Sequence, residues 1–202
     1  MSPDGKEIAF YSFRSGNRDV WVMPSGCGSA RRLTDKRGAW VPTWAPDGKR
    51  LAFTSNRSGA SGIWILDLDG GPPRQLTTNP TGPSSWSPDG SWLAFDAGLW
   101  GAPQAPLWRV SIDGKTVEPL TQGPGRTPRF SPDGDMVVFI GTGERAGNVW
   151  VLSLKDGEER PLTNLASRRG SLAPLALATD GEYVYFAWQE DLGDIWVMDV
   201  VQ

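Results

Sequence analysis

The sequence predicts an all-β protein built from repeated four-stranded sheets. Three marks recur in constant order along its 202 residues. The first mark is a Ser-Pro-Asp-Gly turn or a close variant. The second is a tryptophan after each turn, and the third is a Leu-Thr pair after each of the first four of these tryptophans. The turn aspartates step by 43, 42, 44 and 47 residues, and they are Asp4, Asp47, Asp89, Asp133 and Asp180. This period with regular aromatics is typical of propeller blades, so we predict a β-propeller of five repeats of roughly 43 residues.

The second repeat shows how we expect each blade to fold. Pro46-Asp47-Gly48 is a turn signal, because proline presets φ, aspartate bonds the backbone ahead and glycine accepts positive φ. Leu51 and Phe53 alternate with period two, as in a half-buried strand. We therefore predict strands over residues 40–44, 50–55, 63–67 and 74–77.

The chain is predicted to be one domain over residues 1–202, with repeats of about 1–38, 39–80, 81–124, 125–166 and 167–202. The first and last blades are expected to be incomplete, because the first repeat opens at its turn and the last stops after its third strand. Two arrangements remain open: a closed five-bladed ring, or an open arc of a larger propeller. Bare strand edges recruit partners, so an arc is expected to form a homodimer through its open ends.

The eleven tryptophans require a structural explanation. A blade is a small sheet with two apolar faces, so we place the tryptophan of each third strand in the core between neighbouring blades. These residues are Trp21, Trp64, Trp108, Trp150 and Trp196. The residue three before each later turn aspartate is predicted to be core for the same reason, namely Trp44, Trp86, Phe130 and Leu177.

The repeat resembles that of TolB-type propellers. Residues 2–34 and 45–77 match most fully, through Ser-Pro-Asp-Gly or Ala-Pro-Asp-Gly, Leu-Ala-Phe or Ile-Ala-Phe, Ser-x-Arg-x-Gly and Leu-Thr. The third repeat departs from the pattern over residues 96–106, and the fifth lacks the turn proline. The same repeat also occurs in prolyl oligopeptidase propellers, so the resemblance implies a fold rather than one function. TolB-like proteins are commonly periplasmic or secreted, so the resemblance also implies, loosely, such a location.

Composition excludes several classes of chemistry. With no histidine, Ser-His-Asp and Cys-His nucleophilic sites are impossible. Cys27 is the single cysteine, so an intrachain disulfide and a multi-cysteine zinc site are excluded. We predict no cofactor and no bound metal. A net charge of −3 argues against nucleic acid as a partner, and no stretch reaches the length of a membrane span.

Carboxylates are the remaining candidates for catalysis or calcium binding. The acidic residues outside the turns that draw attention are Asp96 in the third repeat and Glu190, Asp191 and Asp194 in the fifth. A solvated acidic loop is the simpler interpretation of the last three.

The loops near the expected tunnel mouth carry a local excess of arginine. Arg126, Arg168 and Arg169 lie where a fourth strand leads into the next first strand. A rim of one charge sign attracts the other, so we predict binding of an acidic peptide or protein. Trp40, Trp100 and Trp188 also lie near this mouth and are predicted ligand-binding residues, through stacking on a sugar ring or anchoring of a peptide.

The sequence therefore favours a non-catalytic propeller that acts as a protein- or peptide-binding scaffold through its loop face. One alternative is a carbohydrate or small-ligand binder that uses Trp100 and Trp188. Another is the propeller part of a larger prolyl oligopeptidase-like or TolB-like protein, and a carboxylate-only enzyme is a third.

Overall fold

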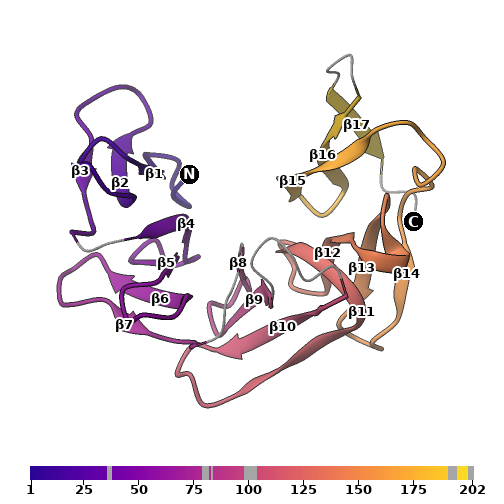
Figure 1. The fold of residues 1–202 in the computed structure, drawn as a ribbon, viewed down its shortest axis with the longest axis horizontal. Coiled ribbons are helices and arrows are strands. Elements are labelled where there is room, and N and C mark those ends of the chain that lie inside the picture. The colour runs from indigo at the N-terminus through magenta and orange to yellow at the C-terminus, as the bar shows by residue number, and fades with distance from the viewer. Residues whose placement is uncertain (36–37, 79–81, 83, 98–103, 191–194, 200–202) are drawn as a thin grey trace.

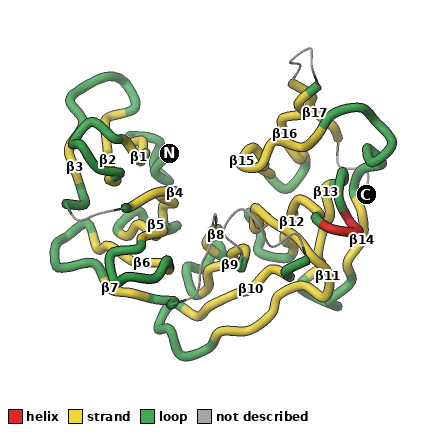
Figure 2. The backbone as a smooth tube through the Cα atoms, viewed as in Figure 1, coloured by secondary structure: helices red, strands yellow, loops and turns green. Residues whose placement is uncertain are grey.

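The computed structural model describes residues 1–35, 38–78, 82, 84–97, 104–190 and 195–199. In this part of the chain the strands form antiparallel sheets that follow one another along an arc (Figure 1). Loops join the strands throughout, and the one helical element in the described residues is a short turn, η1 (Figure 2). The N-terminus lies on the inner side of the arc (Figure 1).

The first two sheets are separate blades. The first contains β1 (Glu7–Ser12), β2 (Asp19–Pro24) and β3 (Arg31–Arg32), and the second contains β4 (Ala39–Trp44), β5 (Arg50–Ser55), β6 (Gly62–Asp67) and β7 (Arg74–Gln75). The strands predicted for the second repeat are thus confirmed, within two residues at each end.

The third and fourth blades are joined into one seven-stranded sheet. Its strands are β8 (Ser84–Trp86), β9 (Trp92–Asp96), β10 (Pro106–Ser111), β11 (Val117–Phe130), β12 (Met136–Gly141), β13 (Val149–Ser153) and β14 (Glu159–Pro161), with η1 at Gly143–Arg145. The first part of β11 pairs with β10 and the second part pairs with β12. One strand is therefore both the outer strand of the third blade and the inner strand of the fourth.

The last sheet contains β15 (Ser171–Thr179), β16 (Tyr183–Gln189) and β17 (Ile195–Asp199). It stands at the opposite end of the arc from β1–β3 (Figure 1). Whether the ends meet in a closed ring in solution stays a prediction.

The turn aspartates hold the turns, as predicted. Asp133 accepts a hydrogen bond from the Ser131 hydroxyl (2.5 Å) and another from the Asp135 N–H (3.0 Å). The Met136 N–H donates in turn to the Ser131 hydroxyl (3.0 Å). The same pattern recurs at Ser2 and Asp4 and at Ser87 and Asp89. The hydroxyl bond lowers the pKa of Asp133 because it stabilises the carboxylate.

Consecutive turns stack along one rim of the arc. Gly134 has φ of +79°, and a Cβ on it would lie 3.5 Å from Pro88 in the preceding turn. A Cβ on Gly181 would lie 3.4 Å from Pro132. Each Pro-Asp-Gly turn is thus in contact with the next, which explains why the motif repeats as a unit.

The Leu-Thr pairs fasten the outer strands. In four blades the threonine hydroxyl accepts a hydrogen bond from a backbone N–H at the start of the third strand, at 2.9 or 3.0 Å. The donors are Val20, Ile63, Leu107 and Val149, and their acceptors are Thr34, Thr77, Thr121 and Thr163. Each hydroxyl satisfies a backbone group that the ladder leaves unpaired, so the motif sets the position of the outer strand.

The core lies between blades, because successive residues of one strand face opposite neighbours. Leu51 and Phe53 of β5 pack with Val20 and Val22 of the first blade. Ala52, between them in sequence, packs instead toward the third blade, in a cluster with Leu93 and Phe95. The second blade is therefore packed against a neighbouring blade on both of its faces.

The tryptophans of the third strands are less buried than predicted. Among the described side chains these rings are half-buried, as are Trp44 and Phe130, whereas Trp86 and Leu177 are buried as predicted. Three of these rings are partly covered by arginines of the Ser-x-Arg pattern and its counterpart rather than by the neighbouring blade alone. Arg14 lies 5.1 Å from the Trp21 ring, Arg57 lies 5.0 Å from Trp64, and Arg145 lies 4.4 Å from Trp150. The Trp196 side chain lies outside the described residues.

We expect Thr121→Val to lower the free energy of unfolding by about 1–3 kcal/mol, because the buried Leu107 N–H loses its acceptor. Urea unfolding measures this change. Thr116→Val, at an exposed position, is the matched control and should stay within about 0.5 kcal/mol of the wild type. Equal stability of the two variants would contradict the assigned role of the Leu-Thr pair.

Candidate functional site

The candidate site is the rim opposite the Pro-Asp-Gly turns. Strands alternate in direction, so the loops that follow β1, β5 and β12 lie at the same rim as the segments that enter β4 and β15. Three groups of charged residues lie at this rim: Asp96 with its arginines, the loop before β15, and the Ser-x-Arg loops.

Asp96 ends β9 and faces the inner strand of the next blade. Its side chain is 8% exposed, and Oδ2 accepts a hydrogen bond from the Thr127 N–H (3.4 Å). Within the described residues Oδ1 has no hydrogen-bond partner. Burial raises the pKa of Asp96 to about 6, although the hydrogen bond from Thr127 and the charges of Arg126 and Arg129 oppose the rise.

Two arginines connect the inner strands of the fourth and fifth blades. Arg126 donates from Nη2 to the Leu172 carbonyl (3.3 Å), and Arg129 donates from Nε to the Leu177 carbonyl (2.9 Å). The Nε of Arg126 is buried and has no partner among the described residues. Arg126 was predicted from the sequence as a rim residue, whereas Arg129 was missed, because an arginine beside a core phenylalanine in a strand gives no signal of its contacts.

A bulge positions these arginines. The register of β11 against β12 shifts between Arg126 and Arg129, and Thr127 between them has φ of +54°. β4 has the same feature, with Val41 at φ of +51°. Positive φ is unusual for β-branched residues, and a bulge re-aims the side chains beside it. The inner strands thus have a strained position at corresponding places in two repeats.

The arginine loop, residues 166–170, precedes β15. Arg168 and Arg169 are exposed there, and neither forms an ion pair with any described residue. Leu172, which accepts the Arg126 bond, follows Arg169 by three residues. The structure therefore brings Arg126 to the base of this loop, as expected for a shared basic rim.

Trp188 packs beneath the arginine loop and holds it by hydrogen bonds. Its ring is 3% exposed, and its Nε1 donates to the Arg169 carbonyl (3.1 Å) and to the Glu190 carboxylate (2.9 Å). The ring therefore lacks the open face that stacking on a ligand requires, and its contacts position the loop instead. Its burial depends on that loop folding over it, which no local pattern shows.

Trp40 is likewise enclosed. It is 8% exposed, and the Arg18 guanidinium lies 5.0 Å from its ring. Trp100, Asp191 and Asp194 lie outside the described residues. Of the six predicted ligand-binding residues, the three arginines thus lie together at the rim and two tryptophans are buried.

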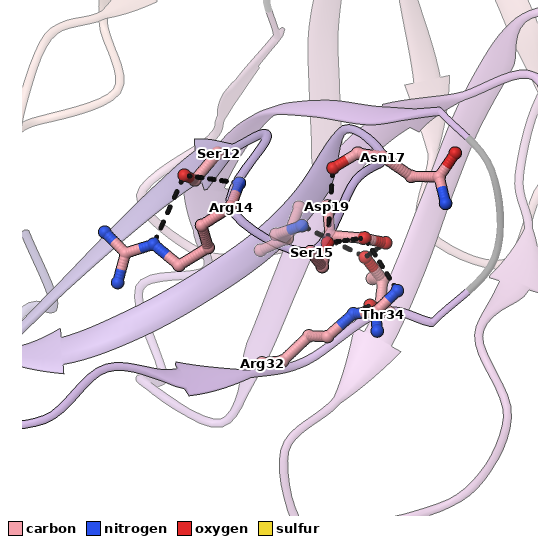
Figure 3. Close-up of polar contacts among 8 residues, drawn as sticks. Ser12, Arg14, Ser15, Asn17, Asp19, Arg32 and Thr34 are labelled. Carbon is pink, nitrogen blue, oxygen red and sulfur yellow. Dashed lines mark hydrogen bonds and ion pairs between the residues drawn. The ribbon is translucent and has the colours of Figure 1, made fainter.

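Hydrogen bonds within the first blade hold its Ser-x-Arg loop. The Ser12 hydroxyl accepts hydrogen bonds from the N–H and the Nε of Arg14, and Asp19 is fully buried (Figure 3). Asp19 accepts from the Ser15 hydroxyl (2.6 Å), the Thr34 hydroxyl (3.0 Å) and the Arg32 guanidinium (2.7 Å). The guanidinium groups of Arg14 and Arg57 in the Ser-x-Arg loops also stack on the rings of Trp21 and Trp64.

The repeated sheets, their stacked turns and the loop rim around the inner strands define a β-propeller. The chain belongs to the family of the TolB beta propeller domain, whose model matches residues 1–201. This confirms the all-β propeller predicted from the repeats and the TolB resemblance.

Solved structures agree with this assignment. A putative TolB from Agrobacterium tumefaciens is 28% identical with a TM-score of 0.72, over 81% of this chain and 63% of that one. TolB from Acinetobacter baumannii is 22% identical with a TM-score of 0.81, over 98% of this chain and 50% of that one. An oligogalacturonate lyase from Vibrio parahaemolyticus has 16% identity and a TM-score of 0.68, over 95% and 57% of the two chains. This chain thus spans about half to two thirds of the lengths of these proteins.

A comparison with curated proteins found no match. No helix among the described residues has the length and apolar character needed to cross a membrane. The described side chains also contain no group of three or more acidic or cysteine residues placed to hold a metal ion. Because a lyase is among the structural neighbours, the architecture alone is compatible with both binding and catalysis.

We expect Asp96→Asn to change how stability depends on pH. A carboxyl whose pKa is raised in the folded state binds its proton more tightly there, so stability is lost as pH rises from the ordinary value of 3.8 through about 6. The variant removes this loss, and its stability relative to the wild type should rise by about 3 kcal/mol between about pH 4 and about pH 7. Urea unfolding at both pH values measures it.

Asp133→Asn is the control of opposite sign. Its pKa is lowered, so its contribution is present above the ordinary value and lost as pH falls, and the variant should be less stable than the wild type at neutral pH. Parallel pH profiles for Asp96→Asn and the wild type would show that Asp96 is not the titrating group.

Proposed function

We propose that this protein is a non-catalytic TolB-like propeller that binds an acidic segment of a protein or peptide at its loop rim. The observation that supports this most is the convergence of Arg126, Arg168 and Arg169 where the inner strand of the fourth blade contacts the start of β15. Two of these guanidinium groups are exposed without an ion-pair partner among the described residues.

The chemistry of the rim favours recognition of carboxylates. Arginine presents a planar fork of donors that matches a carboxylate, and the arginine loop is positioned by Trp188 before any ligand arrives. A positioned donor set loses less conformational entropy on binding than a free one. A short acidic segment that crosses the mouth fits these features.

Other functions have less support. The case for stacking on a carbohydrate is weaker because Trp40 and Trp188 are buried. The case for catalysis by paired carboxylates is weaker because the charges that act on buried Asp96 are those of arginines, not of a second carboxylate. The TolB resemblance and the TolB neighbours support a periplasmic or secreted location.

We expect Arg168→Ala/Arg169→Ala to weaken binding of a labelled oligoglutamate peptide of about ten residues by about tenfold, as two rim charges of about 0.7 kcal/mol each imply. Fluorescence anisotropy at low salt measures the affinity, and added salt should weaken the wild-type complex. The control is the double variant Arg31→Ala/Arg160→Ala, which removes two positive charges from the outer strands β3 and β14 instead of from the rim.

The outer-strand variant should bind like the wild type. Equal losses in both double variants would show a general charge effect rather than a site at the rim. An affinity of the rim variant equal to that of the wild type would refute the proposal.

A further inference from the structure

Asp96 is a carboxylate at a position where the other repeats have none. It follows Phe95, the buried phenylalanine of β9. In the second repeat the corresponding residue is Thr54, whose hydroxyl donates to the Gly82 carbonyl of the following blade (3.4 Å). The position therefore faces the next blade near its inner strand. Counted from the turn aspartates, the residues at this position in the other four repeats are Tyr11, Thr54, Ile140 and Ala187.

The buried carboxylate of Asp96 lacks a counter-charge in direct contact. None of the ion pairs formed among the described residues includes it. Asp19, another buried aspartate, accepts a hydrogen bond from the Arg32 guanidinium as well as bonds from two hydroxyls. Asp96 instead accepts a long bond from the Thr127 N–H (3.4 Å), and its buried Oδ1 has no partner in the described part of the chain. A buried charge with so little compensation favours the protonated form.

The contacts of Asp96 lead directly to the arginine rim. The Thr127 N–H that it accepts belongs to the residue after Arg126. The Arg126 guanidinium donates to the Leu172 carbonyl (3.3 Å), three residues beyond Arg169 of the arginine loop. Asp96 thus lies at the base of the rim, where its charge acts on the arginines without occupying their exposed surface.

The other charged groups near Asp96 are few. Arg126 and Arg129 of β11 are the charges that act on it. The neighbouring strand β8 has no charged residue, and on β10 Arg109 is paired with Glu118. The adjoining stretches of sequence, residues 78–83 and 97–105, contain no ionisable side chain.

The chain also has no histidine, which is the side chain that ordinarily titrates between about pH 5 and pH 8. Burial raises the pKa of Asp96 to about 6, within this range. A buried carboxylate therefore supplies, at the base of the rim, a change of charge near neutral pH.

We propose that Asp96 regulates the arginine rim through its proton: the ionised carboxylate weakens the binding of an acidic segment, and the protonated form strengthens it. The inference rests on the proposed function, because it concerns the affinity of the same site. As pH falls, Asp96 loses its negative charge, and the attraction of Arg126, Arg168 and Arg169 for an anion increases. Solvent ions screen a buried charge less than an exposed one, so Asp96 affects the ligand without contacting it.

The test uses a labelled ten-residue peptide of cysteic acid, whose sulfonates stay ionised at both pH values compared. Fluorescence anisotropy at about pH 5 and about pH 7.5, at one ionic strength, measures the affinity. We expect the wild type to bind about threefold more tightly at the lower pH, as one partly screened charge implies. Asp96→Asn should bind about threefold more tightly than the wild type at the higher pH and about equally at the two pH values.

Two further variants separate the role of Asp96 from a general effect of charge. Asp96→Thr places there the residue of the second repeat and should behave like Asp96→Asn. Asp69→Asn removes an exposed carboxylate from the β6–β7 hairpin, where the Leu68 N–H donates to Lys49 of the turn rim. It should keep the pH dependence of the wild type.

A reciprocal measurement follows the proton itself. Because coupling between two binding events is mutual, saturating peptide should raise the midpoint of the Asp96 ¹³C carboxyl titration by about half a pH unit, the equivalent of a threefold change in affinity. An Asp96 titration that the peptide leaves unchanged would overturn the inference.

The failure of this inference and the failure of the proposed function are distinguishable. If Arg168→Ala/Arg169→Ala binds the peptide like the wild type at both pH values, the rim is not the site and both are refuted. If that variant loses affinity while Asp96→Asn keeps the pH dependence of the wild type, the rim binds the acidic segment and the regulation by Asp96 alone is refuted.

Discussion

The fold depends on packing sheets face to face, because every blade has two apolar faces. In β5, Leu51 and Phe53 face one neighbour and Ala52 faces the other, so neither face can be buried within one blade. Burial of one such phenylalanine contributes about 1.5–3 kcal/mol, which is a large share of a domain's net stability. The repeats therefore stabilise one another in succession.

Polar contacts determine how the sheets align. Stacked Pro-Asp-Gly turns align one rim, and the threonine hydroxyls fix each outer strand against the strand before it. Arg126 and Arg129 connect inner strands near the opposite rim, and Asp96 contacts the fourth blade from the third. The candidate site lies at these cross-blade contacts, so the residues that shape the rim also contribute to the assembly.

The sequence predicted the repeat, the strands of the second blade and the role of the turn aspartates, because each depends on contacts within a few residues. It also placed Arg126, Arg168 and Arg169 at one rim. It did not predict the burial of Trp188, which depends on the arginine loop packing over it, or the stacking of Arg14 on Trp21, which is a contact between a loop and the strand that follows it. Gln122-Gly123-Pro124-Gly125 reads as a turn, yet it is extended within β11, because pairing with the strands on either side outweighs local preference.

That continuous strand has a mechanical consequence. Most blades are joined by a loop, which can bend without breaking a sheet, as residues 162–170 do between β14 and β15. The third and fourth blades are instead continuous through β11, whose first part pairs with β10 and whose second part pairs with β12. We therefore expect these two blades to move less against each other than blades joined by a loop, because an extended strand has fewer accessible backbone conformations than a loop.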